Sequence, residues 1–297
     1  MARIPYVLVD VFAPAPGAGN RVAVVLDARG MSPEEMRAVA QSLGTAEAAF
    51  LLERTGLALS VRFFTPGGEV EFSGHAAVAV GLTAARTGLV PEGTTRLYLH
   101  TPTEVLPVEL VLEAGEPRKA WVRGPAPRFR DLPPYRALRE VLEALGSDER
   151  YLHRGLPYGV AFTGLWSLFV PLIAPGVVDA LEPEMERLKA LCFRLDVATI
   201  HAYAPMGPRS FYARDFAPLL GIPEDPVTGS ANAALGALLA RAGVVPRREG
   251  KVLLTVYQGH HLGNPGVVEV QVEYSPTGEP YSVQIGGEAV IVQTGEV

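Results

Sequence analysis

The chain has 297 residues, of which 48% are hydrophobic and 20% are charged, a balance typical of a globular protein and not of a disordered one. This length predicts two domains, each large enough to bury its own core. The formal net charge of −6, without any basic cluster, argues against a nucleic-acid-binding surface, and the absence of a run of eighteen apolar residues argues against a membrane span.

Cysteine and histidine usage narrows the chemistry further. The single cysteine, Cys192, excludes an internal disulfide and lies in a helical pattern, which indicates a buried structural thiol and not a nucleophile. The six histidines show no metal-ligand spacing, so we expect no metal site. The first residues read as a strand without a signal-peptide pattern, and we expect a cytoplasmic protein.

The first half of the chain predicts short strands and two helices. Ser32-Pro33-Glu34-Glu35 is typical of a helix start, with a serine cap, a proline in the first turn and a glutamate three residues after the cap, and this helix should run to about Leu43. A second helix is expected at 75–86, with Gly88 at its C-cap position. Strands are predicted at 6–12, 22–26, 48–53, 59–64, 96–100, 104–112 and 119–122.

A segment with four prolines, 124–134, is the best linker candidate. It divides the chain into an N-terminal lobe, 1–123, and a C-terminal lobe, 124–287, with the last strand, 288–297, as a candidate to complete the first lobe. In the second lobe we expect helices at 135–145, 183–195 and 230–242, and strands at 167–173, 199–204, 210–214, 252–257, 267–273, 281–286 and 289–293.

One stretch of the chain occurs twice. Residues 73–91 and 228–246 share nine of nineteen positions at a constant offset. Upstream, Arg62-Phe63-Phe64-Thr65-Pro66 matches Arg214-Asp215-Phe216-Ala217-Pro218. A period of about half the chain excludes short-repeat solenoids. It predicts two related lobes, with a site where they meet.

The order of elements predicts an α+β fold. Many short strands, few long helices and no strict strand–helix alternation disfavour a doubly wound sheet. Each repeated helix is rich in Ala, Gly and Val and has no polar face, so we expect it to lie inside its lobe. The expected architecture is two pseudo-symmetric lobes, each a mostly antiparallel sheet around one central helix.

Both repeated helices begin with a hydroxyl residue and a glycine, in Ser73-Gly74-His75 and in Thr228-Gly229-Ser230. A helix N-terminus has unsatisfied N–H groups and a partial positive charge, and glycine lets a ligand approach the backbone, so a carboxylate or phosphate is expected there. Ordinary capping by Ser73 and Thr228 is the alternative, which two matching copies make weaker. Neither GxGxxG nor a P-loop pattern occurs, which disfavours a nucleotide.

Three titratable residues are candidates for acid/base chemistry. His75 would lie at a helix N-terminus, which suits a neutral imidazole, although a histidine satisfied by local backbone is the alternative. Asp225 lies in a proline-flanked turn and by itself reads as a turn former. Glu47 is the only charge in the apolar stretch 44–52, where desolvation suits a general acid or base, unless it lies on the exposed face of a strand.

These residues together resemble the phenazine-biosynthesis PhzF-like family, within the diaminopimelate-epimerase-like fold, over essentially the whole chain. Each motif is a weak signal alone, whereas their joint order and spacing are specific. The motifs are Gly19-Asn20 with Val22-Ala23-Val24-Val25, Glu47, Phe64-Thr65-Pro66 with Gly74-His75, Asp225-Pro226-Val227-Thr228-Gly229-Ser230, and Gln258-Gly259.

The resemblance implies a cofactor-independent isomerase that moves a proton between carbons of a small carboxylic acid. It also implies barrel-like lobes, an active site in the cleft between them, and a homodimer. Glu47 would shuttle the proton, with His75 and Asp225 beside it. The two helix starts would bind and orient the substrate, through Ser73, Gly74, Gly229 and Ser230.

The chain departs from the related epimerases, which use two cysteines as their acid/base pair. Ser73 occupies the region of one thiol and Asp225 lies near the other, whereas Cys192 is elsewhere, so a two-thiol racemase is not expected. A carboxylate-binding protein that has lost turnover is the alternative, against which the retention of Glu47, His75 and Asp225 counts. A hydrolase with Ser230 as nucleophile is disfavoured by the absence of a GxSxG motif.

Overall fold

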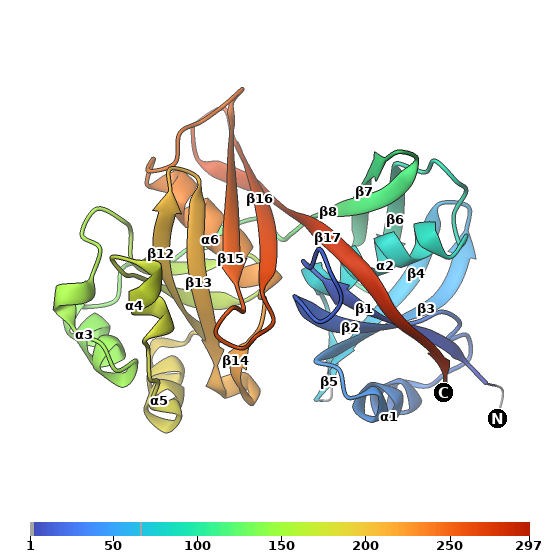
Figure 1. The fold of residues 1–297 in the computed structure, drawn as a ribbon, viewed down its shortest axis with the longest axis horizontal. Coiled ribbons are helices and arrows are strands. Elements are labelled where there is room, and N and C mark those ends of the chain that lie inside the picture. The colour runs from blue at the N-terminus through green and yellow to red at the C-terminus, as the bar shows by residue number, and fades with distance from the viewer. Residues whose placement is uncertain (1–2, 66) are drawn as a thin grey trace. The chain divides into compact units, whose positions relative to one another are not determined.

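The computed structural model describes residues 3–65 and 67–297, so Pro66 of the Phe64-Thr65-Pro66 motif lies outside the described residues. The fold is α+β, and the chain divides into two compact units (Figure 1). Unit 1 contains Met1–Arg123 and Gly286–Val297, and unit 2 contains Gly124–Ile285.

Eight strands of unit 1 pair in a closed ring, which makes this sheet a barrel. The β2–β3 and β4–β6 pairs are parallel, whereas β1–β2, β3–β4, β6–β7, β7–β8 and β1–β17 are antiparallel. The β8–β17 pair closes the ring. The strands are β1 (Pro5–Val11), β2 (Asn20–Val25), β3 (Glu47–Thr55), β4 (Ala58–Thr65), β6 (Arg96–His100), β7 (Val105–Glu113), β8 (Glu116–Arg123) and the last part of β17 (Pro280–Glu296), and a short β5 (Gly68–Val70) pairs with β4.

The two helices of unit 1 differ in how much they bury. Helix α2 (Gly74–Arg86) packs against β1, β2, β3, β7 and β8, and its residues from Gly74 to Ala84 are buried except His75, as expected for a helix without a polar face. Helix α1 (Pro33–Leu43) buries only Met36 and Ala40, and it starts with the predicted capping box of Ser32 and Glu35.

Unit 2 is built in the same way around helix α6 (Gly229–Arg241), which packs against β10, β11, β15 and β16. The β11–β12 and β13–β15 pairs are parallel, and β9–β10, β10–β11, β12–β13 and β15–β16 are antiparallel. The strands are β9 (Arg128–Phe129), β10 (Gly159–Phe162), β11 (Trp166–Pro171), β12 (Thr199–Gly207), β13 (Ser210–Ala217), β14 (Ile222–Asp225), β15 (Lys251–Gln258), β16 (Gly266–Tyr274) and the first part of β17. The other helices are α3 (Tyr135–Ala144), η1 (Glu149–Tyr151), α4 (Pro175–Asp179), α5 (Met185–Leu195) and η2 (Pro218–Leu220).

The repeat in the sequence is a repeat of topology and register. In both units a helical crossover joins two parallel strands, an antiparallel hairpin and a short strand follow, and the apolar helix then crosses to the next parallel strand. Arg62 lies opposite Phe50 in unit 1, and Arg214 lies opposite Ala202 in unit 2. The upstream match around Arg62 and Arg214 therefore pairs structurally equivalent residues.

Some elements differ from those that the sequence predicts. The strands expected at 281–286 and 289–293 are one strand, β17, which serves both units. Gly286 interrupts the apolar pattern because the Trp121 ring packs there, and a Cβ at this glycine would lie 2.4 Å from the ring. The predicted linker 124–134 contains β9, and the predicted turn at Asp225 is the end of β14, because the backbone pairs with Asp215.

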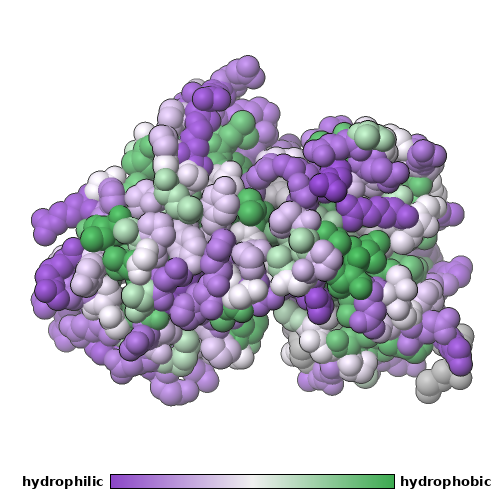
Figure 2. Space-filling view, in the orientation of Figure 1, coloured by the Kyte–Doolittle hydropathy of each residue, from purple (hydrophilic) through white to green (hydrophobic). Residues whose placement is uncertain are grey.

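The surface contributes few constraints on function. Within the described parts of the chain, no helix is long and apolar enough to cross a membrane. Figure 2 shows hydrophilic residues over most of the face in view of each unit, with hydrophobic residues in separate patches between them. Separate apolar patches between hydrophilic residues are normal on the surface of a globular protein.

A glycine at the same repeat position lets each central helix approach its sheet closely. A Cβ at Gly81 of α2 would lie 2.5 Å from Val108 Cγ1 on β7, and a Cβ at Gly236 of α6 would lie 2.6 Å from Val270 Cγ1 on β16. Both valines are fully buried and β-branched, so they have little freedom to move aside. These shared glycines therefore set the distance between helix and sheet.

We expect Gly81→Ala and Gly236→Ala each to lower the free energy of unfolding. Overpacking costs about 1–3 kcal/mol, which exceeds the gain of about 0.5–1 kcal/mol from replacing a helical glycine. Gly176→Ala in α4 is the matched control, because a Cβ there meets no atom within 4 Å and the change should be neutral or stabilising. Urea unfolding measures all three, and equal effects would contradict the packing argument.

Candidate active site

Glu47 is the first residue of β3 and precedes a buried apolar run. Its position is set by the parallel register with β2, in which Glu47 lies opposite Val22. The residues from Ala48 to Leu51 are all buried, whereas the Glu47 side chain is 18% exposed. The carboxylate therefore lies at the edge of the unit 1 core, between an apolar interior and solvent.

Ser73 joins Glu47 to the start of α2. As the N-cap, its Oγ accepts a hydrogen bond from Ala76 N at 3.2 Å, and the same hydroxyl donates to Glu47 Oε2. Its residue is 4% exposed. Ser73 therefore caps α2 and also contacts the candidate acid/base, and the binding of a carboxylate or phosphate at this helix start stays a prediction.

His75 completes a cluster of three side chains in unit 1. Its Nδ1 lies 3.4 Å from Ser73 Oγ, its Nε2 lies 3.5 Å from Glu47 Oε2, and its side chain is 12% exposed. Nε2 is buried without a hydrogen-bond partner among the described residues. Ser73 lies 26 positions after Glu47 in the sequence and two positions before His75. The side chains of Ser73 and His75 therefore both approach Glu47 Oε2.

This cluster has the components of proton transfer. A carboxylate that is mostly buried, a hydroxyl that donates to it and an imidazole near it can accept, hold and return a proton. The cluster lies beside the N-terminus of α2, which begins at Gly74 and favours negative charge.

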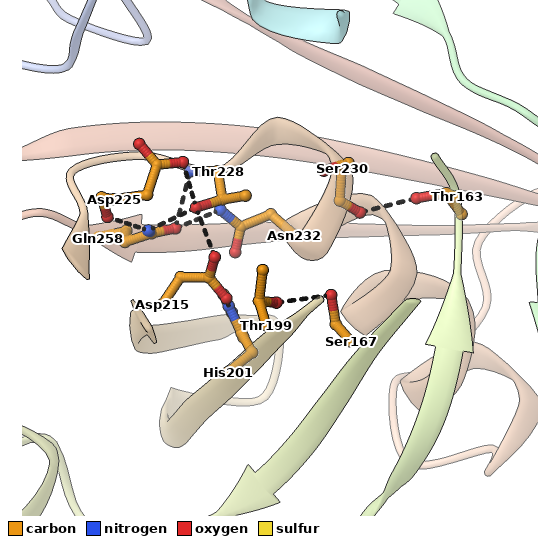
Figure 3. A network of polar contacts seen from close by, with 10 residues as sticks. All are labelled: Thr163, Ser167, Thr199, His201, Asp215, Asp225, Thr228, Ser230, Asn232 and Gln258. Carbon is orange, nitrogen blue, oxygen red and sulfur yellow. Dashed lines mark hydrogen bonds and ion pairs between the residues drawn. The ribbon is translucent and has the colours of Figure 1, made fainter. Parts of the chain in front are cut away.

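Thr228 occupies the cap position of α6 but does not cap it with its side chain. Instead, Thr228 Oγ1 lies 2.7 Å from Asp225 Oδ2 and 3.0 Å from Asp215 Oδ2 (Figure 3). Asp225 is half-buried, and Asp215 is fully buried. The repeat thus placed a hydroxyl at both helix starts, but only the first one is an ordinary N-cap.

Gln258 fixes the orientation of this second group. Its Oε1 accepts hydrogen bonds from Thr228 N at 3.1 Å and from Asn232 Nδ2 at 2.7 Å. Its Nε2 donates to the Asp225 carbonyl at 2.9 Å and to Thr228 Oγ1 at 3.1 Å. Gly259 follows in a left-handed conformation, with φ +87° and the Asn264 and Pro226 carbonyls against it, which explains the Gln258-Gly259 motif.

Sequence reasoning missed one polar pair of unit 2. His201 on β12 lies opposite Asp215 on β13, both side chains are 0% exposed, and His201 Nδ1 is 2.9 Å from Asp215 Oδ1. The available signal was Asp215 at the position that Phe63 occupies in the first copy, since a carboxylate at a core position needs a partner.

The register assigns counterparts that the sequence left open. Glu47 opposite Val22 corresponds to Thr199 opposite Ser167, and Thr199 Oγ1 donates to Ser167 Oγ at 2.8 Å. The candidate acid/base of unit 1 therefore has a neutral counterpart in unit 2.

An ion pair is repeated next to both short strands. Arg62 binds both carboxylate oxygens of Glu69 through Nε and Nη2, and Arg214 binds Glu224 in the same way. The second pair is buried, with side chains 2% and 8% exposed, and it anchors β14 directly before Asp225. This bidentate pair helps to hold Asp225 in place.

Ser230, Gly74 and Gly229 lie in the first turns of the central helices. Thr163 Oγ1 donates to the Ser230 carbonyl at 2.7 Å (Figure 3), which holds the start of α6, and Ser230 is half-buried. That Asp225, Ser230 and Glu47 all contact the same substrate stays a prediction.

Cys192 is a free, buried thiol in the core of unit 2, as the helical pattern predicts. Burial raises the pKa of the Cys192 thiol to about 12, and the negative charge of Asp215 adds to this. Since the thiolate is the nucleophile, such a group is inert at neutral pH.

Among the described residues, no group of three or more His, Cys, Asp and Glu side chains is placed to hold a metal ion.

Known proteins are similar to this chain over almost its whole length. The family model described as phenazine biosynthesis-like protein, PhzC-PhzF, covers residues 9–295. A protein of Deinococcus radiodurans named an uncharacterized isomerase is 45% identical over 98% of this chain and 93% of its own. The trans-2,3-dihydro-3-hydroxyanthranilate isomerase of Pseudomonas fluorescens is 31% identical over 98% of both chains.

Solved structures show the same fold. The phenazine biosynthesis protein of the PhzF family from Bacillus anthracis matches with a TM-score of 0.90 and 29% identity, over 100% of this chain and 99% of its own. A probable proline racemase from Agrobacterium radiobacter shares the fold alone, with a TM-score of 0.66 and 15% identity over 99% and 92% of the two chains.

We expect Cys192 not to react with a thiol reagent in the folded protein at pH 8. A pKa of about 12 leaves on the order of 10⁻⁴ of the thiols ionised at this pH, and the sulfur is out of reach of solvent. Labelling followed by mass spectrometry should add no group to the folded chain and one group to the unfolded chain. Rapid labelling of the folded chain would contradict a structural role for this thiol.

Proposed function

Because the chain belongs to the PhzC-PhzF family of phenazine biosynthesis-like proteins and is an isomerase like its relatives, we propose that it moves a proton between two carbons of a small carboxylic acid. In this proposal Glu47 is both the general base that accepts the proton and the general acid that returns it. The observation that carries this proposal is the Glu47 carboxylate, held by the Ser73 hydroxyl beside the His75 imidazole.

The proposed step needs one group that accepts a proton and then returns it. Glu47 takes the proton from a carbon of the substrate, and the electron pair of the broken C–H bond delocalises into the neighbouring unsaturated system. A proton from the Glu47 carboxyl group then forms a C–H bond at a different carbon, so the double bond moves. Because the Glu47 side chain is 18% exposed, its carboxyl proton exchanges with water before it returns to carbon, and a reaction in deuterated water labels the product.

The helix starts supply the electrostatics of the proposed step. A substrate carboxylate binds best where backbone N–H groups and a helix dipole favour negative charge, as at Gly74 in α2 and at Gly229 and Ser230 in α6. His75, at the first turn of α2, would assist Glu47 through the imidazole that lies 3.5 Å from its carboxylate. Asp225 is proposed as a second acid/base group, on the basis of its place in the Asp225–Ser230 motif.

A first substrate to test follows from the Pseudomonas fluorescens relative. The name of that protein gives trans-2,3-dihydro-3-hydroxyanthranilate as its substrate, an unsaturated carboxylic acid with amino and hydroxyl groups. We propose a substrate of this chemical class for the present chain.

Glu47→Gln should lower the rate of solvent deuterium incorporation into this substrate by about 10²–10⁴-fold. The amide keeps the volume of the side chain and an oxygen for the Ser73 hydroxyl, but it cannot carry the proton. NMR or mass spectrometry of reactions in deuterated water measures the rate. Glu53→Gln, at an exposed position of the same strand, is the control and should react like the wild type.

Two outcomes contradict this proposal. Equal deuterium incorporation by wild type and Glu47→Gln would exclude Glu47 as the proton carrier. Binding of substrates of this class without any incorporation would favour a binding protein without turnover. A screen of metabolite extracts in deuterated water extends the test beyond the first compound.

Ser73→Ala should reduce both stability and activity, whereas Ser32→Ala should reduce stability alone. Both serines cap a helix, and loss of such a cap costs about 0.5–2 kcal/mol. Only Ser73 also donates to Glu47. Thermal unfolding and the deuterium assay separate the two effects. The role of Ser73 beside Glu47 is wrong if both variants retain full activity.

A further inference from the structure

A buried histidine–aspartate pair lies behind Asp225 in unit 2. His201 and Asp215 face each other across β12 and β13, with no exposed side-chain surface and 2.9 Å between Nδ1 and Oδ1. Burying a carboxylate is costly unless hydrogen bonds satisfy it. The position carries Phe63 in the first copy, so the fold itself does not require a charge there.

The surroundings of His201 specify its protonation. Its Nε2 is buried without a hydrogen-bond partner among the described residues, and its ring packs edge-to-face with the apolar ring of Phe169. An imidazolium would bury an unpaired N–H together with a positive charge. The neutral ring with its hydrogen on Nδ1 avoids both, and it donates to Asp215 Oδ1.

The Thr228 hydroxyl connects this pair to Asp225. Its Oγ1 lies 3.0 Å from Asp215 Oδ2 and 2.7 Å from Asp225 Oδ2. A hydroxyl has one hydrogen, so it donates to only one of these oxygens. Both contacts are hydrogen bonds only when one of the two carboxyl groups carries a proton and donates it to Oγ1.

Gln258 excludes another assignment of these hydrogens. Because its Oε1 accepts from Thr228 N and Asn232 Nδ2, its Nε2 must face Thr228 Oγ1 and donate to it at 3.1 Å. The hydroxyl hydrogen therefore points toward a carboxyl group and not toward Gln258. Figure 3 shows the resulting chain, in which His201, Asp215, Thr228 and Asp225 follow one another.

From this geometry we infer that His201 and Asp215 are positioning residues that, through the Thr228 hydroxyl, keep one proton shared between Asp215 and Asp225. In one arrangement Asp215 holds the proton and donates to Oγ1, while the hydroxyl donates to the Asp225 carboxylate. In the other, Asp225 holds the proton and the hydroxyl donates to Asp215. The exchange breaks two O–H bonds and forms two, and it moves one proton between the acids.

This inference rests on the proposed acid/base role of Asp225. The shared proton reaches Asp225 from Asp215 through the hydroxyl, without bulk water, and Asp225 then gives it to a substrate, which leaves both groups as carboxylates until a proton returns to Asp225. The other titratable groups near the pair do not compete for this proton. The Cys192 thiol has its pKa raised to about 12 by burial first and by Asp215 second, and Arg214 is held in its ion pair with Glu224.

The free protein provides a test that needs no substrate. The ¹⁵N resonances of His201 should shift on Asp225→Asn, because the amide cannot share the proton and the hydroxyl then donates only to Asp215. In a Thr228→Val background the response should be lost, and in a Thr228→Ser background it should be retained. A response that is equally large with valine, or absent in the wild type, would overturn the inference.

Asp215→Asn tests the same chain through activity. The amide keeps a partner for His201 Nδ1 and for Thr228 Oγ1 but cannot pass a proton, so kcat for deuterium incorporation should fall by up to about 10²-fold with little change in KM or thermal stability. Asp179→Asn is the control. Asp179 is also a hydrogen-bonded aspartate, but it accepts from Tyr212 and does not belong to the series from His201 to Asp225. Unchanged kcat and an unchanged pH profile in Asp215→Asn contradict the inference.

The two proposals fail in different ways. Wild-type protein without any isotope exchange contradicts the proposed function, while the ¹⁵N response still decides the shared proton. Exchange that depends on Glu47 but not on Asp215, with no coupling between Asp225 and His201, leaves the function intact and rejects the shared proton. If Thr228→Val does not fold, Asp215→Asn decides alone.

Discussion

The structure depends on one constraint, the burial of a helix that has no polar face. Such a helix is stable only when strands surround it, and α2 and α6 are each packed against several strands of their own unit. Gly81 and Gly236 let the helices approach Val108 and Val270 without overpacking. Once the helix is enclosed, its N-terminus is fixed relative to the strand ends, and the functional candidates occur there.

The two copies have used this common frame differently. In unit 1 the cap residue Ser73 still caps the helix, and its hydroxyl also reaches Glu47. In unit 2 the Thr228 side chain makes no capping hydrogen bond, and its hydroxyl lies between the carboxyl groups of Asp215 and Asp225. The counterpart of Glu47 is Thr199, a neutral residue. Equivalent backbone positions therefore carry chemically different groups.

Membership in the PhzC-PhzF family and the names of the relatives establish an isomerase, whereas the shared fold with a proline racemase describes only the scaffold. The residues present here are consistent with that distinction. Cys192, the one thiol in the sequence, is buried and inert, so the chain has no pair of thiols for proton transfer, and the cluster at the start of α2 contains a carboxylate, a hydroxyl and an imidazole. Proton transfer by Glu47 fits this set of groups.

The sequence alone determined the elements and features that depend on neighbouring residues: the Ser32 capping box, the buried apolar helices, the repeat and the α+β class. It also identified Glu47, His75 and Asp225 as candidates by residue type and family motif. Only the tertiary structure decided which groups touch, because these contacts join residues far apart in the chain. Strand register brings His201 opposite Asp215, helix enclosure brings Ser73 to Glu47, and pairing on both sides makes β17 one strand. A local sequence pattern does not contain the distances between side chains that lie far apart in the chain, whereas backbone hydrogen bonding between strands fixes them.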